Sequence, residues 1–241
     1  MTSVAQKQFS FGTVVSQAIS VFTANLASFV IVSLLLLLPL LVYNLVAVGA
    51  PTGGYSAASL FAIVIQMVLS QLLAATISFA TFQYLRGQAV GIGECLSRGL
   101  SLIGPVIGVA FLVGLITGIG LVLIVIPGII AAVMLWVAIP VAVVERPGVV
   151  ESLKRSADLT KGSRWTIFGI LFVVGLVLII VTMILSFILL SAAGFTVYSI
   201  GVWILQAIFS AFSATLAAVG YYFLRSSKEG VDIADIAKVF D

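Results

Sequence analysis

The residues able to do chemistry in this 241-residue chain are few, and their densest group lies in residues 145–164. That segment carries three carboxylates and five of the eleven Lys and Arg residues: Glu145, Arg146, Glu151, Lys154, Arg155, Asp158, Lys161 and Arg164. The chain contains no histidine, which is the usual general base and the commonest metal ligand. It also contains no Walker-type phosphate-binding loop. The sequence therefore predicts no catalytic residue, no metal site and no cofactor, and we do not expect an enzyme.

The same segment offers a candidate surface for lipid or for a protein partner. Its members are Lys154, Arg155, Lys161, Arg164 and Trp165. A basic residue followed by tryptophan is typical of the boundary between membrane and water, and cations clustered there attract anionic lipid headgroups. A plain membrane anchor would have the same composition. Glu151 stands four residues before Arg155, so a helix is expected to bring the two together as an ion pair.

Three glutamines within apolar stretches are the candidate lining of a polar pathway: Gln66, Gln71 and Gln206. No ionisable residue accompanies them at the expected membrane depth, whereas proton- and ion-coupled pumps normally keep one there. The other interpretation is hydrogen bonding between helices, which contributes about 0.6 kcal/mol on average. This second interpretation is the favoured one.

Charged residues are absent from three long stretches, 8–85, 99–144 and 165–224. Each stretch is apolar and just long enough to cross a bilayer twice, at roughly 20 residues per helix. Hydrophobic residues make up 62% of the chain and charged residues 8%, whereas about a quarter of the residues in soluble domains are charged. The sequence thus predicts an all-α polytopic membrane protein, with six transmembrane helices in a single transmembrane domain, 1–241.

The expected spans cover 27–48, 58–83, 102–123, 127–144, 165–190 and 199–224. All eleven Lys and Arg residues lie between the hairpins or at the ends of the chain. By the positive-inside rule both termini are therefore expected in the cytoplasm, with residues 225–241 as a cytoplasmic tail. Because the cations follow membrane boundaries, the net charge of +3 does not indicate a nucleic-acid partner. Pro140 should kink the fourth span, since its ring removes a backbone donor.

An amphipathic stretch precedes each hairpin, which predicts three interfacial helices on the cytoplasmic surface. Their expected apolar faces are Val14, Ala18, Val21 and Phe22 in the first, Ile92, Leu96, Leu100 and Ile103 in the second, and Val149, Val150, Leu153 and Ala157 in the third. The three patterns superpose, which indicates a pseudo-threefold repeat of an interfacial helix followed by a transmembrane hairpin. The repeat units are expected at about 9–83, 90–144 and 148–224. The alternative is that any helix flanking a span looks amphipathic.

Four segments carry a resemblance to a known family: 126–130 (IPGII), 139–145 (IPVAVVE), 151–156 (ESLKRS) and 159–162 (LTKG). Through them the chain resembles the glycerophosphoryl diester phosphodiesterase membrane domain and the YciC-like uncharacterised inner-membrane proteins of bacteria. The resemblance implies a multi-pass protein of the bacterial inner membrane whose own activity is not established. In the phosphodiesterases a separate barrel is catalytic and uses histidine and metal-binding carboxylates. This chain lacks histidine, so the resemblance implies no enzymatic activity here.

Two functions fit these observations. The first is a non-enzymatic integral membrane module that organises lipids, anionic ones included, or a membrane or cytosolic protein partner, through its cytoplasmic face. The second is a carrier or channel for a small uncharged or lipidic compound. A cavity lined by Gln66, Gln71 and Gln206 would favour the carrier, and a closed apolar core would favour the module.

A topology reporter fused after Arg225 or placed before Lys7 should be active in the cytoplasm, because the distribution of Lys and Arg sets the orientation of the bundle. A reporter inserted near Gly53 or Ala193 should be active on the other side. Reporters that work only inside or only outside the cytoplasm, compared in the same cells, check this. A C-terminus outside the cytoplasm would mean that one span does not cross, and the short fourth span with Pro140 is the first to suspect.

Overall fold

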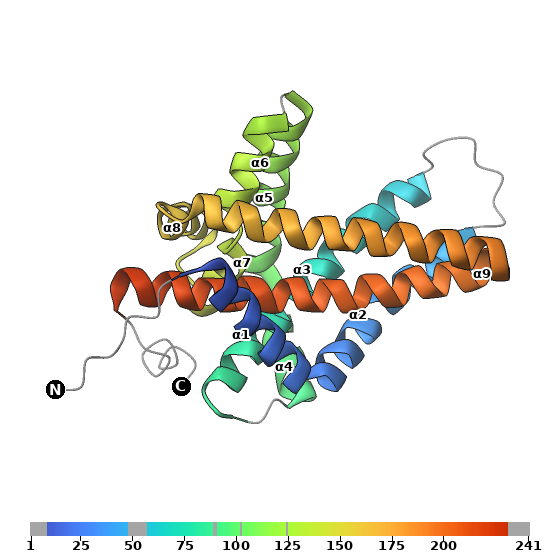
Figure 1. Ribbon diagram of the computed structural model, residues 1–241, viewed down its shortest axis with the longest axis horizontal. Coiled ribbons are helices and arrows are strands. Elements are labelled where there is room, and N and C mark those ends of the chain that lie inside the picture. Colours follow the sequence, from blue (N-terminus) through green and yellow to red (C-terminus); the bar gives the residue numbers. More distant parts are fainter. Residues whose placement is uncertain (1–8, 48–56, 89–90, 102, 124, 231–241) are drawn as a thin grey trace.

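All regular structure in the described part of the chain is helical. The computed structural model describes residues 9–47, 57–88, 91–101, 103–123 and 125–230. Its helices, shown in Figure 1, are α1 (Phe11–Ala24), α2 (Leu26–Ala47), α3 (Ala57–Leu85), α4 (Ile92–Ser101), α5 (Ile103–Leu123), α6 (Val125–Met134), α7 (Ala138–Val144), α8 (Val149–Thr160) and α9 (Arg164–Glu229). The expected cytoplasmic tail lies outside the described residues from residue 231 onward.

Six helical stretches are long and apolar enough to cross a membrane. They are Leu26–Val46, Phe61–Leu85, Gly104–Leu121, Val125–Val144, Arg164–Ser191 and Gly194–Glu229. Each overlaps the span predicted at that place in the sequence. The all-α class with six membrane-length apolar helices is therefore confirmed, and the chain is a multi-pass membrane protein.

Helix α9 is two antiparallel arms joined at a single glycine. Gly194 has φ 75° and ψ 178°, a backbone conformation that is open to glycine and strongly disfavoured for other residues. The chain reverses there, and Figure 1 shows the two arms lying together along the long axis of the molecule. The turn therefore needs no polar loop between the fifth and sixth spans.

The fourth span is broken in the middle, as Pro140 predicts. Helix α6 ends at Met134 and α7 begins at Ala138, whose backbone N–H donates to the carbonyl of Leu135 at 3.0 Å. Pro140 sits in the first turn of α7, where its missing N–H leaves no helical bond unmade. Trp136, within the break, packs so closely on Gly220 of α9 that a Cβ at Gly220 would lie 2.5 Å from its ring.

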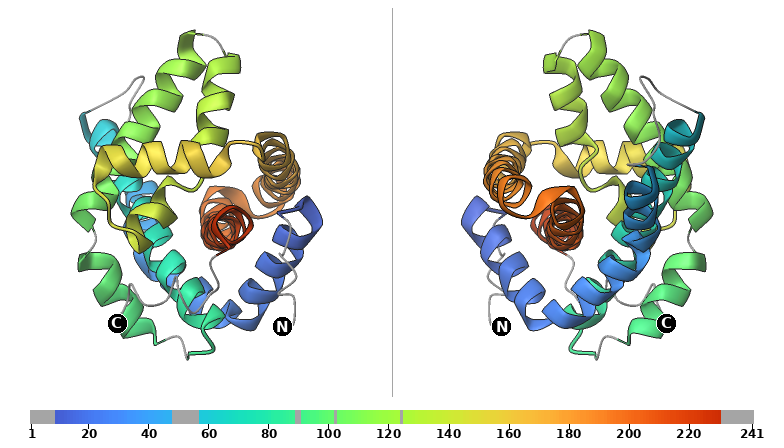
Figure 2. Two further views of the ribbon diagram at one scale, coloured as in Figure 1. Left: turned by 90° about the vertical axis from the view of Figure 1, so that its left-hand side faces the viewer. Right: turned by 90° about the vertical axis from the view of Figure 1, so that its right-hand side faces the viewer.

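Helix α1 is separate from the first span. The chain departs from helical geometry at Asn25, with φ −117° and ψ 19°, and Figures 1 and 2 show α1 meeting α2 at an angle. Ser10 caps the start of α1 by accepting a hydrogen bond from the backbone N–H of Thr13. The buried residues of α1 are those predicted from the sequence: Val14, Ala18, Val21 and Phe22.

The buried faces of α4 and α8 differ from the predicted ones. In α4 the thiol of Cys95 is buried and Leu100 is 53% exposed. The reason is a close approach of α4 to α3, where Gly99 lies directly against Thr76. In α8 the buried residues are Ser152, Leu153, Ser156, Leu159 and Thr160. Val149 packs on Gly108 of α5 as predicted, whereas Val150 is 49% exposed, so α8 turns its hydroxyl groups rather than Val150 toward the neighbouring helices.

The three hairpins do not run alongside one another throughout. In Figure 1 helices α5 and α6 rise steeply away from the arms of α9, and the side views in Figure 2 agree. The largest buried cluster lies where α1, α7, the second half of α3 and the last part of α9 meet. The outer parts of the hairpins expose large apolar side chains, among them Leu35, Phe111, Ile126 and Phe187. The threefold repeat and the interfacial position of α1, α4 and α8 stay predictions.

Replacing Gly99 by alanine should destabilise the protein. A Cβ at this position would lie 2.2 Å from Thr76 Oγ1 and 3.4 Å from Thr76 Cα, so α4 would have to move away from α3. Overpacking of this kind typically costs about 1–3 kcal/mol, and it should lower the thermal unfolding temperature measured in detergent.

The matched control is Gly93→Ala in the same helix. Nothing lies within 4 Å of the Cβ position at Gly93, and alanine is favoured over glycine in helices by up to about 1 kcal/mol. If Gly99→Ala unfolded at the same temperature as Gly93→Ala or higher, the close α3–α4 contact would be wrong.

Candidate functional site

Helix α8 is held against the break in the fourth span by two hydroxyl groups. Ser156 Oγ donates to the carbonyl oxygen of Met134 at 2.9 Å. The Thr160 hydroxyl lies 3.2 Å from the same oxygen and shares its single hydrogen between it and the carbonyl oxygens of Ser156 and Ala157, at 3.0 and 3.1 Å. This carbonyl ends α6 and would otherwise bond the N–H of Ala138, which is engaged with Leu135 instead. A buried backbone oxygen without a donor is costly, so these bonds explain why α8 buries its serines and threonine.

The docked α8 presents Arg155 to a closed network of charges, the ion-pair network, which consists of Glu145, Arg155, Tyr221, Arg225 and Glu229. Arg155 Nε donates to both carboxylate oxygens of Glu145, at 2.8 and 3.1 Å, and its Nη2 donates to Glu229. Arg225 Nε donates to Glu229 at 2.9 Å, and its Nη1 donates to the Tyr221 hydroxyl at 3.0 Å. The tyrosine hydroxyl donates to Glu145 at 2.8 Å, which closes the ring.

The ion-pair network lies partly out of water and is charge-balanced. The side chains of Glu145 and Arg225 are 17% exposed, so their bonds are screened less than those on an open surface. For Arg155, burial lowers the guanidinium pKa, but its hydrogen bonds to Glu145 and Glu229 outweigh this effect, and the pKa is raised. The network therefore clamps α8 and the end of α9 to the end of α7.

This arrangement corrects the expected role of Arg155. The sequence placed it among the free cations of the candidate surface and paired it with Glu151. In the structure Arg155 bonds Glu145 and Glu229 instead, because α8 is rotated about its axis to bring Ser156 and Thr160 under Met134. Arg155 is thus a structural group.

The other members of the candidate surface do remain together at the junction of α8 and α9. Lys154 and Lys161 are exposed, and no carboxylate within the described ranges forms an ion pair with them. Trp165 is 86% exposed. Lys228 donates to the backbone carbonyl of Asp158 at 2.6 Å. It is attracted by the Asp158 carboxylate and repelled by the more numerous cations nearby, Lys161 and Arg164 among them. The junction is therefore a region of excess positive charge.

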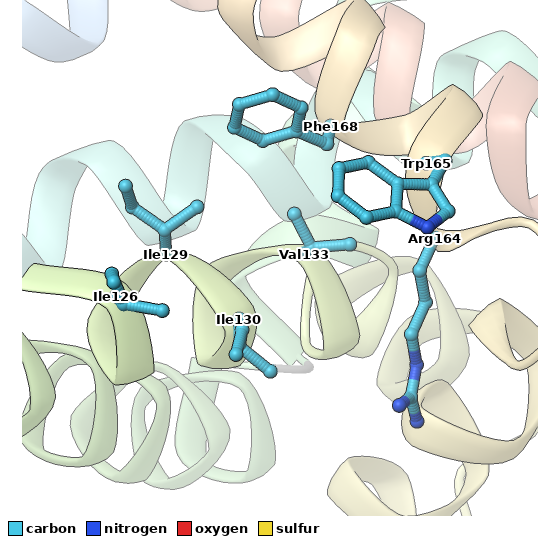
Figure 3. Close-up of a pocket in the computed structure, with 7 residues that line it drawn as sticks. All are labelled: Ile126, Ile129, Ile130, Val133, Arg164, Trp165 and Phe168. Atoms are coloured by element: carbon cyan, nitrogen blue, oxygen red, sulfur yellow. The ribbon is translucent and has the colours of Figure 1, made fainter.

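An apolar groove of about 440 Å³ opens beside this junction, between α6 and the start of α9 (Figure 3). Its lining is Ile126, Ile129, Ile130 and Val133 from α6, with Arg164, Trp165 and Phe168 from α9. In Figure 3 Ile126 and Ile129 lie at one end, and the guanidinium of Arg164 lies at the other. We call this space the α6–α9 groove.

Neither of the two grooves described within the placed residues brings the three glutamines together. Gln206 faces a second groove of about 340 Å³ between the arms of α9, together with Thr182, Ser210 and Ser213. Gln66 and Gln71 belong to neither of these two grooves. Gln66 is exposed and Gln71 is half-buried on α3. A common polar lining by these three residues stays a prediction.

Cys95 is placed as a packing residue. Its side chain is buried between α4 and the helices beneath it. Burial, and after it the nearby Glu94 carboxylate, raises the pKa of the Cys95 thiol to about 11. Nucleophilic chemistry at neutral pH requires the thiolate, which the raised pKa disfavours.

Sequence reasoning did not identify Glu145, Tyr221, Arg225 and Glu229 as one site. A usable signal was present in the last three, which recur every four residues and therefore share one helix face. Glu145 also follows directly on the apolar residues of α7, a place where a carboxylate is expensive unless it is paired. Their common partner Arg155 could not be inferred, because it depends on the rotation of α8.

No protein-family model, curated protein or solved structure matches this chain. The resemblance to the phosphodiesterase membrane domain and to the YciC-like proteins therefore stays an expectation from the sequence.

A double-mutant cycle should couple Arg155 to Glu145 and leave it uncoupled from Glu151. We expect the pair Glu145→Gln and Arg155→Gln to show an interaction free energy of about 0.5–3 kcal/mol, the range for residues within one charge network. The cycle with Glu151→Gln should give less than about 0.5 kcal/mol. Thermal or denaturant unfolding in detergent measures both. Coupling to Glu151 as large as that to Glu145 would contradict the rotated placement of α8.

Proposed function

We propose that this chain is a non-enzymatic module of the bacterial inner membrane that organises lipid or partner proteins through its cytoplasmic face. The observation that carries the proposal is the excess positive charge at the α8–α9 junction. The ion-pair network uses Arg155 and Arg225 for internal balance, whereas Lys154 and Lys161 remain exposed beside it. In a multi-pass protein, exposed cations of this kind are available to bind molecules around the helical bundle, such as lipids or a protein partner.

The position of these cations supports anionic lipid as a principal ligand. Lys161 lies three residues before Arg164, where the more apolar arm of α9 begins, with a mean hydropathy of 3.2. A cation at such a boundary stands at headgroup depth, where each Lys or Arg contributes about 1 kcal/mol of attraction to an anionic leaflet. The orientation that puts this boundary in the cytoplasm follows from the positive-inside rule.

The non-enzymatic part of the proposal rests on the state of the carboxylates. Glu145 and Glu229 are both held by arginines. Burial raises the pKa of the Glu229 carboxyl, but its hydrogen bonds from Arg225 and Arg155 outweigh this effect and lower the pKa, which disfavours Glu229 as a proton donor. The chain has no histidine to act as a base beside them. The Cys95 thiol is buried with a raised pKa.

The second candidate is a carrier or channel for a small uncharged or lipidic compound. The groove between the arms of α9 favours it, because Thr182, Gln206, Ser210 and Ser213 bring hydroxyl and amide groups into a membrane-length hairpin. A transport path would have to continue from this groove to both membrane surfaces. Gln66 and Gln71 lie elsewhere, so the lipid- and partner-binding module is the better supported function.

The test is the charge-removing double variant Lys154→Gln with Lys161→Gln, which leaves the ion-pair network intact. Purified in native lipid, it should retain less anionic lipid or less of a cytosolic protein than the wild type, by about fivefold for each cation removed. Native mass spectrometry of bound lipids and proteins gives the measurement. Raised salt should bring the wild type toward the variant, because exposed charges are screened.

The matched control is Lys154→Arg with Lys161→Arg, which keeps both charges. It should behave as the wild type. Equal retention of lipid and protein by the Gln variant, the Arg variant and the wild type would reduce the junction to a membrane anchor and refute the proposal.

A further inference from the structure

The α6–α9 groove forms because two apolar hairpins, α5–α6 and the two arms of α9, diverge beside α8. Helices α5 and α6 rise away from α9 (Figures 1 and 2), so the facing side chains of α6 and α9 cannot cover one another along their length. Ile126 is 67% exposed and Ile130 is 48% exposed. Both belong to a stretch apolar enough to lie in a membrane, where the molecules available to cover them are lipid chains.

The end of the groove near α8 is charged rather than apolar. Arg164 lines it, and its Nε is buried without a hydrogen-bond partner. Leaving a buried donor of a charged group without an acceptor is expensive. Within the described residues no carboxylate forms an ion pair with Arg164, while Lys161 and Lys228 lie nearby and add to the positive charge. An anion is the group that this end lacks.

We propose that the α6–α9 groove is a binding site for one anionic phospholipid. An acyl chain lies along Ile126, Ile130 and Phe168, and the phosphate accepts hydrogen bonds from the guanidinium of Arg164. Trp165, at the mouth of the groove, covers the glycerol region. The inference rests on the proposed lipid-organising function and assigns to it a single, saturable site.

Shape and charge together select this occupant. The groove volume of about 440 Å³ is in the range of ordinary small-molecule sites, which are mostly apolar with a few polar groups that fix orientation. A second copy of this chain using the same face would bring Lys161 and Arg164 against their own counterparts, and like charges oppose such pairing. A zwitterionic lipid would place its own cation beside the junction.

Tryptophan quenching tests the site directly. The protein is placed in phosphatidylcholine nanodiscs that contain a rising fraction of phosphatidylglycerol with brominated acyl chains, since bromine quenches tryptophan at short range. The signal of Trp165 is the difference between the wild type and Trp165→Phe. We expect quenching of Trp165 to saturate at a low fraction of brominated phosphatidylglycerol, and brominated phosphatidylcholine to produce no saturation.

Two substitutions should weaken this saturation. Arg164→Gln should raise the half-saturating fraction at least about fivefold, and Ile130→Phe should raise it by filling the groove. The controls are Arg146→Gln, an exposed arginine outside the groove, and Ile119→Phe, an exposed isoleucine of α5. Both controls should match the wild type.

Quenching that rises linearly with brominated phosphatidylglycerol in the wild type would overturn the site without any variant. Equal half-saturation for Arg164→Gln and Arg146→Gln would also overturn it, as would a lipid-free dimer of the wild type that Ile130→Phe dissociates. If anionic lipid is still retained through Lys154 and Lys161 in those cases, the groove fails and the proposed function stands. If the wild type retains neither anionic lipid nor a protein partner, both the groove site and the proposed function are refuted.

Discussion

The carbonyl oxygen of Met134 needs donors from outside its own helix, and the placement of α8 follows from this need. The break between α6 and α7 removes the regular helical bond at that oxygen, and a partly buried backbone oxygen without a donor is costly. Ser156 supplies a donor, and the Thr160 hydroxyl lies beside the same oxygen. Their position fixes the rotation of α8, and the rotation in turn places Arg155 over Glu145 and leaves Lys154 and Lys161 outside. One broken span thereby sets both the ion-pair network and the charged surface.

Because the ion-pair network is neutral in itself, it leaves the charge of the remaining cations unbalanced. Glu145 and Glu229 balance Arg155 and Arg225 within a ring that also includes the Tyr221 hydroxyl. Because these charges cancel locally, the field outside the bundle at this end is governed by the lysines of α8 and by Arg164. A partly buried network of this kind contributes more to a defined geometry than to net stability, since desolvation offsets much of the attraction. The network holds the last turn of α9 in place beneath α8.

The features that could be predicted from the sequence are those decided by composition and local backbone chemistry. Long gaps without charge gave the six membrane-length helices, Pro140 gave the break in the fourth span, and periodic apolar residues gave the buried face of α1. The predictions that failed depended on partners distant in the chain. The predicted face of α8 was right for Val149 and Leu153, which pack together against α5 and α7. It was wrong for Val150, which is exposed, because a carbonyl on α6 draws the serines of α8 inward, and the pairing of Arg155 was wrong for the same reason. The α6–α9 groove could not be foreseen either, since it requires two hairpins to diverge, and nothing local in the sequence encodes that angle.

The spans have unequal lengths, and this matters for the bilayer that surrounds them. The first arm of α9 is an apolar stretch of 28 residues and α5 is a helix of 21 residues, which at the helical rise correspond to about 42 and 32 Å. A typical hydrocarbon core is about 30 Å thick. The long arm must tilt to stay within such a core, whereas α5 matches its thickness. The two hairpins therefore meet the same bilayer at different tilts.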